Sequence, residues 1–329
     1  MKRLVLIDGH AILHRAYHAF PTTLRTRKGE IVNAIYGFTR ILLTILKELQ
    51  PEYVAVAFDL PGPTFRHKEY VGYQAQRPAM EKDLVDQVDR VEQVVKALNI
   101  PIFTAPGFEA DDVIASLTVQ ALTKNQKSRI KNHGKKIHNS QFIIHNSNLE
   151  VIIVTGDKDI MQLVREGVKV YAPGKGFSQG EFFDRQKVKE ILGIWPEQIV
   201  DYKALVGDAS DNYPGVPGIG PKTAVKLLEE FGSLENIYKE IKKIEIKKLR
   251  EKLIAGEESA QLSKKLATIV TNAPVKLNLK ACRLRDYDPQ KVRRLFEELE
   301  FRSLLNKLPG TGVEKEEKAK GEQMRLIES

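Results

Sequence analysis

Short apolar runs rich in β-branched residues alternate with segments of helical periodicity along the first half of the chain. The expected strands are residues 3–7, 53–58, 100–104 and 151–155, with a weaker fifth at 168–172. Between them, residues 31–48 and 84–98 repeat apolar side chains at the spacing of an amphipathic helix. Strands that alternate with helices in this way predict a parallel, three-layer α/β domain, which we expect over residues 1–186.

The second half of the chain has a different pattern. From about residue 187 the strand signal stops, and helical patterns joined by short Gly and Pro turns predict a mostly helical region over 187–308. Residues 124–148 contain six Lys or Arg, three His and no acid, which predicts a mobile basic insertion. Residues 309–329 have no aromatic residue and mixed charges, which predicts a disordered tail.

Composition and charge exclude several classes of protein. The 329 residues include 52 Lys and Arg against 43 Asp and Glu, a formal charge of +9, and a single Cys. One Cys cannot build a disulfide scaffold or a Cys-rich zinc site, so any metal must be held by oxygen or His ligands. The apolar runs are far shorter than the roughly 18 residues of a membrane span, and Asp8 ends the first run too early for a signal peptide. We expect a cytoplasmic monomer with a polyanionic partner.

Acidic residues gather at the ends of the predicted strands. Asp8, Asp59 and Asp157 follow three of the apolar runs. Because the carboxyl ends of parallel strands lie along one edge of a sheet, where ligands bind in open α/β folds, we expect these acids to converge. Six more acids are candidates for the same edge: Glu109, Asp111 and Asp112 at the start of a helix, Asp159, and Asp208 with Asp211. Taken singly, each acid is also explained as a helix N-cap or a turn residue.

Taken together, the nine acids indicate a cation site. Nine carboxylates at one edge would repel one another and be difficult to ionise unless cations lay between them. Oxygen ligands favour Mg²⁺ or Mn²⁺. Two such ions about 4 Å apart stabilise the attacking and leaving oxygens of a phosphoryl displacement. The acids therefore favour a two-metal site for phosphodiester chemistry.

Five motifs in order carry a resemblance to a known family. They are Ile-Asp-Gly-His at 7–10, Thr-Phe-Arg-His at 64–67, Glu-Ala-Asp-Asp-Val at 109–113, Thr-Gly-Asp-Lys-Asp at 155–159 and Gly-Asp-Ala-Ser-Asp-Asn-Tyr-Pro-Gly-Val-Pro-Gly-Ile-Gly at 207–220. Over about residues 1–308 the chain resembles the 5′ nuclease domain of bacterial DNA polymerase I, in the flap endonuclease superfamily. The resemblance implies a PIN-like sheet with a helical arch, followed by a helix-three-turn-helix motif.

The resemblance also implies two metal sites, for which we expect two Mg²⁺ ions, with Mn²⁺ as the alternative. The residues of the tighter site would be Asp8, Asp59, Glu109, Asp111 and Asp112. Those of the second site, which in the family often act through water, would be Asp157, Asp159, Asp208 and Asp211.

The glycine turn at 215–220 has two interpretations. It is an ordinary helix-turn-helix packing unit, or its free backbone N–H groups at Gly218 and Gly220 meet a DNA phosphate, with Lys222 and Thr223 beside them. The resemblance favours the second and implies a K⁺ ion at this helix-three-turn-helix element. Contacts to the DNA backbone carry no sequence information, so DNA structure should select the substrate.

Residues 61–90 mix cations with aromatic side chains. The resemblance makes this segment a helical arch through which a single 5′ strand passes, with Tyr73 available to stack on bases. The family generally has a Lys directly after this Tyr, near the scissile phosphate, whereas this chain has Gln74. Arg66, Lys68 or Arg77 are the candidates to supply the catalytic charge. His10, His14 and His18, spaced i,i+4, are expected to be structural or to lie near phosphate.

The resemblance implies a structure-specific 5′-3′ exonuclease and flap endonuclease that removes 5′ flaps and RNA primers in replication and repair. Two alternatives stay open: a PIN-like ribonuclease, and a catalytically weak DNA-junction binding protein, which Gln74 supports. Gln323 to Ile327 resembles the Gln-led peptides that dock on the bacterial sliding clamp, so this clamp is an expected partner. We expect the chain to be either a stand-alone nuclease or part of a longer protein.

Overall fold

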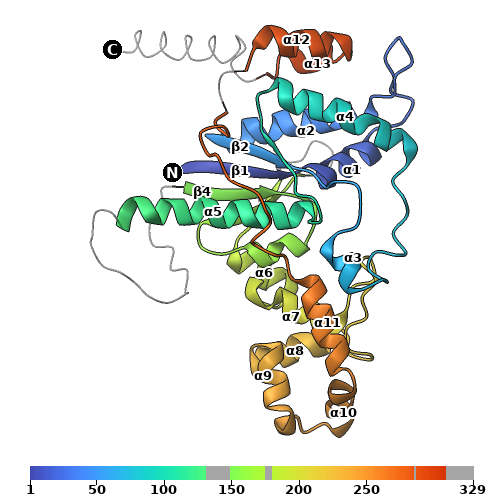
Figure 1. Cartoon of the computed structure of the whole chain (residues 1–329), viewed down its shortest axis with the longest axis vertical. Coiled ribbons are helices and arrows are strands. Elements are labelled where there is room, and N and C mark those ends of the chain that lie inside the picture. The colour runs from blue at the N-terminus through green and yellow to red at the C-terminus, as the bar shows by residue number, and fades with distance from the viewer. Residues whose placement is uncertain (131–148, 175–179, 285–286, 309–329) are drawn as a thin grey trace, which may run out of the picture.

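The computed structural model describes residues 1–130, 149–174, 180–284 and 287–308 of the chain. Its centre is a six-stranded sheet in the order β3-β2-β1-β4-β5-β6 (Figure 1). Neighbouring strands from β3 to β5 in this order are parallel, and β6 is antiparallel to β5. The strands are Lys2–Asp8 (β1), Tyr53–Ala57 (β2), Ile102–Phe103 (β3), Leu149–Val154 (β4), Val168–Ala172 (β5) and Glu181–Phe183 (β6).

Helices cover both faces of the sheet because the central strands are apolar on both sides. Along β1, Leu4 and Leu6 belong to one hydrophobic core, and Val5 and Ile7 belong to the other. One face is covered by α5 and the other by α1, α2 and α4. These helices are Gly9–Ala19 (α1), Asn33–Leu49 (α2), Lys82–Ala97 (α4) and Ala110–Ile130 (α5). The predicted three-layer α/β fold is confirmed.

A second group of helices lies at the bottom of Figure 1. Its helices are Arg185–Leu192 (α6), Ile199–Val206 (α7), Pro221–Phe231 (α8), Leu234–Lys239 (α9), Lys247–Ala255 (α10) and Glu257–Ala267 (α11). Short 3-10 helices are Asp159–Leu163 (η1), Pro196–Gln198 (η2) and Ile241–Lys243 (η3). The mostly helical character expected after residue 187 is therefore present in α6 to α11.

The chain leaves this second group of helices after α11 and returns to the α/β domain. After α11 it runs back along α5, where the side chain of Gln120 bonds the backbone of Val275 and Leu277. It then joins the far end of the sheet, where Val54 N–H donates to the carbonyl of Cys282 at 2.7 Å. Helices α12 (Pro289–Glu298) and α13 (Arg302–Leu305) finally pack their apolar side chains into the core shared with α2 and α4. The boundary at 186/187 stays a prediction, but residues after about 281 lie on the α/β domain.

Three local expectations need correction. The strand expected at 100–104 is only Ile102–Phe103, because it lies at the edge of the sheet and pairs with β2 alone. Strand β6 was not predicted, because three residues are too few to show an alternating pattern. Helix α5 continues to Ile130, so the first seven residues of the expected insertion are helical. The rest of the insertion and the tail, with the segment 323–327, lie outside the described residues.

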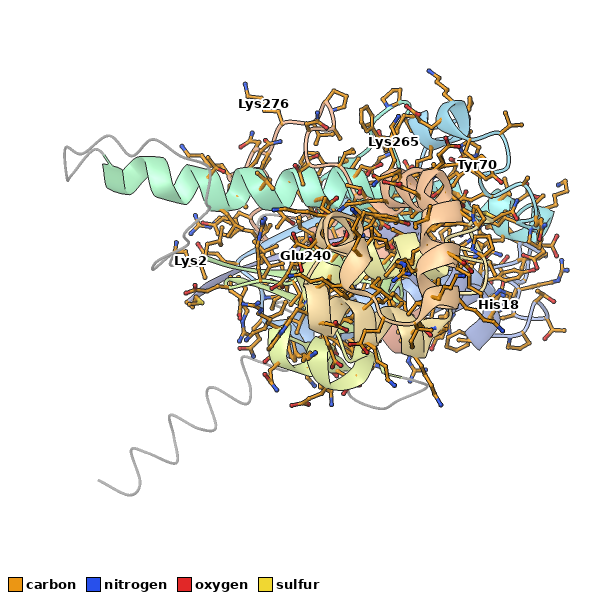
Figure 2. All side chains as sticks on the ribbon, turned by 90° about the horizontal axis from the view of Figure 1, so that it is seen from below. Lys2, His18, Tyr70, Glu240, Lys265 and Lys276 are labelled. Carbon is orange, nitrogen blue, oxygen red and sulfur yellow. The ribbon has the colours of Figure 1, made fainter. Side chains whose placement is uncertain are left out.

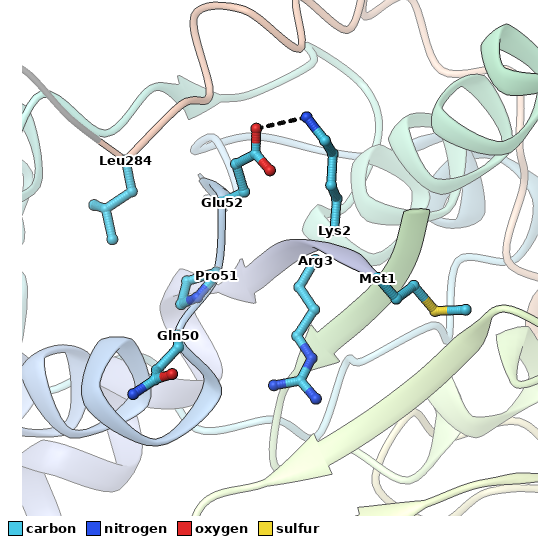
Figure 3. A pocket seen from close by; sticks show the side chains of 7 residues that line it. All are labelled: Met1, Lys2, Arg3, Gln50, Pro51, Glu52 and Leu284. Atoms are coloured by element: carbon cyan, nitrogen blue, oxygen red, sulfur yellow. Dashed lines mark hydrogen bonds and ion pairs between the residues drawn. The ribbon is translucent and has the colours of Figure 1, made fainter. Parts of the chain in front are cut away.

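The amino ends of the strands hold no functional candidate. A hollow of about 540 Å³ there is lined by Met1, Lys2, Arg3, Gln50, Pro51, Glu52 and Leu284 (Figure 3). Lys2 and Glu52 form an ion pair of 2.9 Å across it, so their charges compensate each other. Among the helices of the described residues, none is long and apolar enough to cross a membrane.

Candidate active site

Asp8 ends β1 and begins α1, and both of its oxygens are occupied. One oxygen accepts the N–H of Ala11 at 3.0 Å and so caps α1, and the other accepts the hydroxyl of Thr155 at 2.8 Å. Burial, together with the charges of Asp59 and Asp157, outweighs these hydrogen bonds and raises the pKa of Asp8 to about 6. The N-cap interpretation is therefore correct for this residue, and its role in a metal site stays a prediction.

Asp59 follows β2 and links it to α1 and α5. One oxygen accepts the N–H of Ala110 at 2.7 Å, and the other lies 3.1 Å from Nδ1 of His10. Burial favours the neutral acid, but the hydrogen bond and charge of His10 and the N–H of Ala110 outweigh it and lower the pKa of Asp59. His10 thus orients an acid of the site, as the structural interpretation of the histidines suggested.

Asp111, in the first turn of α5, carries the least compensated charge of the site. Its carboxylate accepts no hydrogen bond from the described residues, whereas Asp8 and Asp59 each accept at least one. Burial raises the pKa of Asp111 well above its ordinary value, and the charges of Asp8, Asp157, Asp59 and Glu109 raise it further. A carboxylate in this environment needs a cation or a proton.

Glu109 lies between the arch segment and α5. Thr64 donates to one of its oxygens at 3.1 Å, and the hydroxyl of Tyr73 donates to the other at 3.2 Å. Burial raises the pKa of Glu109 to about 7, while the charge of Arg66 lowers it and that of Asp112 raises it. Glu109 therefore holds the base of the arch as well as facing the site.

Asp112 and Arg66 form a buried clamp, which differs from what we expected of both. The guanidinium of Arg66 binds both oxygens of Asp112 at 2.8 and 2.9 Å, and it also donates to the carbonyls of Leu266 and Thr268. The same two oxygens accept the N–H groups of Glu109 and Val270. With the Asp112 side chain 0% exposed and that of Arg66 3% exposed, neither is free for a metal ion or a phosphate. The pair instead joins α3 (Phe65–Glu69), α5 and the end of α11.

Four acids and one lysine form the second half of the site. Asp157 and Asp159 follow β4, and the N–H of Asp159 donates to Asp157 at 2.8 Å. Lys203, on α7, forms ion pairs with Asp159 and with Asp208, the latter at 2.5 Å. Burial raises the pKa of Asp159 to about 6 against the charge of Lys203. Hydrogen bonds from Lys203 and Ser210 outweigh burial at Asp208 and lower its pKa to about 2.

Asp211 is held by the arch segment. The side-chain amide of Gln74 donates to one oxygen of Asp211 at 2.9 Å, and the hydroxyl of Tyr73 lies 3.4 Å from the other. Gln74 has φ of 53° and donates its backbone N–H to the carbonyl of Asp211 at 2.9 Å. Asn212 donates to the carbonyl of Gly72 at 2.7 Å. We call these contacts between residues 72–74 and 211–212 the arch latch.

Tyr73 is not placed to stack on bases, contrary to expectation. It is 3% exposed, and its ring meets that of His67 edge to face. Tyr70, which lies near Lys265 in Figure 2, is more exposed and packs against the cluster that includes Leu266. Lys265 forms an ion pair with Glu69. Lys68 and Arg77 are both exposed, and the positive charge of Arg77 contributes to lowering the pKa of Asp59. Of the three candidate cations, Arg77 is therefore an exposed one whose charge acts on an acid of the site, whereas the charge of Arg66 reaches Glu109 from a buried position.

The glycine turn precedes α8 as the motif predicts. Gly218 has φ of 79° and is exposed, and Gly220 is the N-cap of α8, with Lys222 and Thr223 in the first turn. Lys252 donates to the carbonyl of Gly218 at 3.1 Å. A Cβ on Gly220 would meet nothing within 4 Å, whereas one on Gly215 would lie 2.2 Å from the backbone nitrogen of Gly207. Gly215 is thus the glycine that close packing of the turn requires.

The ligand atoms at this edge suit hard cations, although the acidic side chains do not surround a common centre in this structure. Within the described ranges, no group of three His, Cys, Asp or Glu side chains is placed to hold a metal ion as it stands. The donors that face the edge are carboxylate oxygens. Burial raises the pKa of four of these acids, and Asp111 accepts no hydrogen bond from the described residues. Oxygen donors of this kind fit Mg²⁺ or Mn²⁺.

Two family models match the chain. One describes the N-terminal resolvase-like domain of a 5′-3′ exonuclease and covers residues 3–136, and the other describes a 5′-3′ exonuclease C-terminal SAM fold and covers 194–290. The chain belongs to the 5′-3′ exonuclease family. It is thus a domain of the 5′-3′ exonuclease type, and this confirms the predicted family. The match decides against the PIN-like ribonuclease.

Relatives of this exonuclease domain include DNA polymerase I of several bacteria. The enzyme of Caldicellulosiruptor bescii is 41% identical over 93% of the chain, and that of Bacillus caldotenax is 40% identical over 96%. The chain spans about a third of the length of these relatives, 33% of each.

Solved structures share the fold. T5 5′-exonuclease with bound zinc ions superposes with a TM-score of 0.63 at 18% identity, covering 91% of this chain and 99% of that one. The flap endonuclease of bacteriophage T5, in a pseudo-enzyme-product complex with DNA and metal ions, gives 0.60 at 20% identity, covering 91% and 100%. The catalytic core of Rad2 with DNA substrate gives 0.53 at 18% identity, covering 91% and 87%.

Three residues of the site were missed or undervalued by sequence analysis. Thr155 belongs to a quoted motif, yet only its hydrogen bond to Asp8 assigns it a role. Lys203 has no sequence signal, because a lysine in an amphipathic helix is normally exposed. His10 lies in the first motif, and its contact with Asp59 was not predictable from spacing alone.

Proposed function

We propose that this domain hydrolyses phosphodiester bonds near the 5′ ends of DNA, as a 5′-3′ exonuclease and 5′-flap endonuclease, and that it removes RNA primers in replication and repair. The observation that carries the proposal is the convergence of acids from β1, β2, β4, α5 and the 208–211 loop at one edge of the sheet, with the pKa of four of them raised by burial. An edge of this kind can bind cations and, through them, phosphate groups.

Two Mg²⁺ ions are the proposed cofactors, with Mn²⁺ as a substitute. Asp8, Asp59, Glu109 and Asp111 would hold the first ion, and Asp157, Asp159, Asp208 and Asp211 would surround the second. When bound, the ions supply an activated water and neutralise charge on the phosphate. Asp112 and Arg66 act as positioning residues, because their hydrogen bonds fix the start of α5, where Glu109 precedes the helix and Asp111 lies in its first turn.

We propose that the protein holds DNA by the phosphate backbone of the DNA, at the turn that precedes α8. The exposed turn at Gly218, the N-cap at Gly220 and the side chains of Lys222 and Thr223 offer donors to a phosphate at the N-terminus of α8. A K⁺ ion at this motif remains part of the proposal. Arg77 and Lys68 are the proposed cations for the 5′ strand, since Tyr73 and Arg66 are buried.

A labelled 5′-flap substrate tests the proposal. Mg²⁺ should support cleavage near the junction, and EDTA should abolish it. A matched duplex without a flap should be shortened from its 5′ end, and single-stranded RNA of the same sequence should survive. Binding of the flap without cleavage at saturating Mg²⁺ would favour the alternative of a catalytically weak junction-binding protein.

The proposed partners extend beyond DNA to a sliding clamp, engaged through Gln323 to Ile327, and we propose a cytoplasmic monomer. Removing residues 323–329 should leave flap cleavage by the free enzyme intact and abolish pull-down by the cognate clamp. The segment resembles clamp-docking peptides, and a linker of about 14 residues, 309–322, would raise the local concentration of nuclease at a clamp-loaded junction. Equal clamp binding with and without the segment would contradict the idea.

A further inference from the structure

Lys203 occupies an unusual position in the site. It projects from α7 between Asp159, which follows β4, and Asp208, in the loop after α7, and it forms an ion pair with each. Its side chain is 15% exposed. A partly buried ammonium between two carboxylates is a cation at the place where the second metal ion is proposed to bind.

Charge balance explains why a cation is needed there in the metal-free protein. Asp157, Asp159, Asp208 and Asp211 bring four acids to this half of the site. Among the described residues, Lys203 is the cation that forms ion pairs with members of this group. Removing both the metal ion and Lys203 would leave the acids to repel one another at short range.

The space beside Lys203 would allow its side chain to move. A pocket of about 740 Å³ lies next to it, and Lys203 is among its lining residues. The lining also includes the charged residues Asp157, Lys158, Asp159 and Asp208 and the side chains of Leu192, Ile194, Ile199 and Tyr202. The methylene groups of a lysine side chain pack favourably on apolar side chains while its ammonium stays in a polar environment. The pocket therefore offers a second position for the side chain without a change in the backbone of α7.

We propose that Lys203 is an internal, displaceable counter-ion that holds Asp159 and Asp208 in place of the second metal ion and competes with that ion for them. The inference rests on the two-metal site of the proposed function and extends it to a residue of this chain. Binding of the second ion moves the ammonium away from Asp159 and Asp208, toward the pocket. The second ion is thus bound more weakly than the first because it must replace a cation that is already present. Lys203 is in this view a positioning residue that sets metal affinity.

Calorimetric titration of the DNA-free protein with Mn²⁺ tests the competition without any turnover. Lys203→Met removes the charge and keeps the length of the side chain, and should bind the weaker ion at least about tenfold more tightly than wild type. Lys203→Arg keeps the charge and should bind it no more tightly than wild type. Lys96→Met, which removes a helical lysine paired with Glu92 at 2.6 Å, is the matched control and should match wild type. Equal or weaker binding of the weaker ion by Lys203→Met overturns the proposal.

A second measurement uses the wild-type chain, in case Lys203→Met folds poorly. In protein labelled with ¹³C at lysine Cε, the Lys203 signal, identified by its loss in Lys203→Arg, should move toward the position of exposed lysines as Mg²⁺ is added. A signal that stays in place at saturating Mg²⁺ contradicts displacement. Failure of the proposed function has a different signature, since a chain without the two-metal site would bind no Mn²⁺ in wild type or in any variant, and would show no EDTA-sensitive cleavage.

Discussion

Adjacent residues in the first turn of α5 have opposite roles. The carboxylate of Asp111 accepts no hydrogen bond from the described residues, whereas that of Asp112 accepts four, two of them from Arg66. A charge without compensation costs stability until a cation binds it. A charge that is fully paired stabilises the fold and is costly to remove.

Asp111→Asn should therefore separate catalysis from stability. We expect the single-turnover rate of flap cleavage to fall by more than about 100-fold, because a proposed ligand is lost. Flap binding measured with Ca²⁺ should stay within a few-fold of wild type. In EDTA the variant should melt no lower than wild type, since a repulsive charge has been removed. Full cleavage activity would rule out the assignment of Asp111.

Asp112→Asn, the neighbouring and isosteric change, should do the reverse. It leaves the guanidinium of Arg66 buried with only part of its hydrogen bonds, so the free energy of unfolding should fall by roughly 3 to 5 kcal/mol. Urea denaturation in EDTA measures the loss. A stability equal to that of Asp111→Asn would show that the clamp contributes nothing.

At the scale of elements, the arch segment and the helical region are joined in two places. Arg66 donates to carbonyls at the end of α11, and the arch latch connects residues 72–74 to 211–212. The turn that follows the latch depends on Gly215, which has φ of 62° and packs against Gly207. These connections place Asp211 and Glu109 relative to each other, although they belong to different parts of the chain.

The arch latch should be measurable by hydrogen exchange. The double variant Gln74→Ala, Asn212→Ala removes two of the three side-chain contacts and leaves that of the Tyr73 hydroxyl, and the amides of residues 70–77 should exchange roughly tenfold faster. Gln76→Ala, an exposed change in the same segment, is the control and should leave exchange as in wild type. Unchanged exchange in the double variant would mean that the backbone contact from Gln74 and the hydroxyl contact from Tyr73 to Asp211 suffice.

The two glycines of the turn should respond differently to the same change. Gly215→Ala forces a Cβ into the left-handed region and against backbone, so it should lower the free energy of unfolding by roughly 1 to 3 kcal/mol and weaken duplex binding. Gly220→Ala, where a Cβ meets nothing, should change stability by less than about 0.5 kcal/mol. Chemical denaturation and a binding titration with one duplex measure both. Equal losses would contradict the packing argument.

For the whole molecule, the acidic edge makes stability depend on pH when metal is absent. Asp8 and Asp159 have a folded pKa of about 6 and Glu109 of about 7, each raised above its value in the unfolded chain. The folded state therefore holds these protons more tightly, and the stability they supply is complete below about pH 4 and is lost as pH rises through the folded pKa values. Asp208 has a pKa lowered to about 2, so its protonation changes the stability only at pH values below this range.

In EDTA the melting temperature should thus decrease as pH rises from about 5 to about 8. Saturating Mg²⁺ should remove most of the decrease, because the ions replace the protons. Differential scanning calorimetry at several pH values provides the measurement. A melting temperature that rises with pH in EDTA would mean that the acids are not held close together.

Recognition of DNA by its backbone also predicts a property of the whole molecule. The logarithm of the affinity for duplex should fall linearly with the logarithm of the salt concentration. Lys222→Gln should reduce that slope by about one, to the same degree for unrelated sequences. A loss that depends on base sequence would contradict contact with the backbone.

The sequence by itself determined the strands, the helices and the set of acids, because these follow from local pattern. Apolar runs buried on both faces became β1, β2, β4 and β5, and an acid placed at a strand end had to lie at the carboxyl edge. The family followed from five motifs that need no knowledge of contacts. The very short strands β3 and β6 were not predicted correctly, because they have too few residues to show a period.

Only the tertiary structure decided which of these acids are free and which are paired. Asp112 meets Arg66 across 46 residues of sequence, Asp159 meets Lys203 across 44, and Asp211 meets Tyr73 across 138. Adjacent acids look alike in sequence, and no spacing rule connects partners so far apart. The protonation and the role of each carboxylate depend on its burial and its partners, and these exist only once β1, α5, α7 and the arch have packed around one edge.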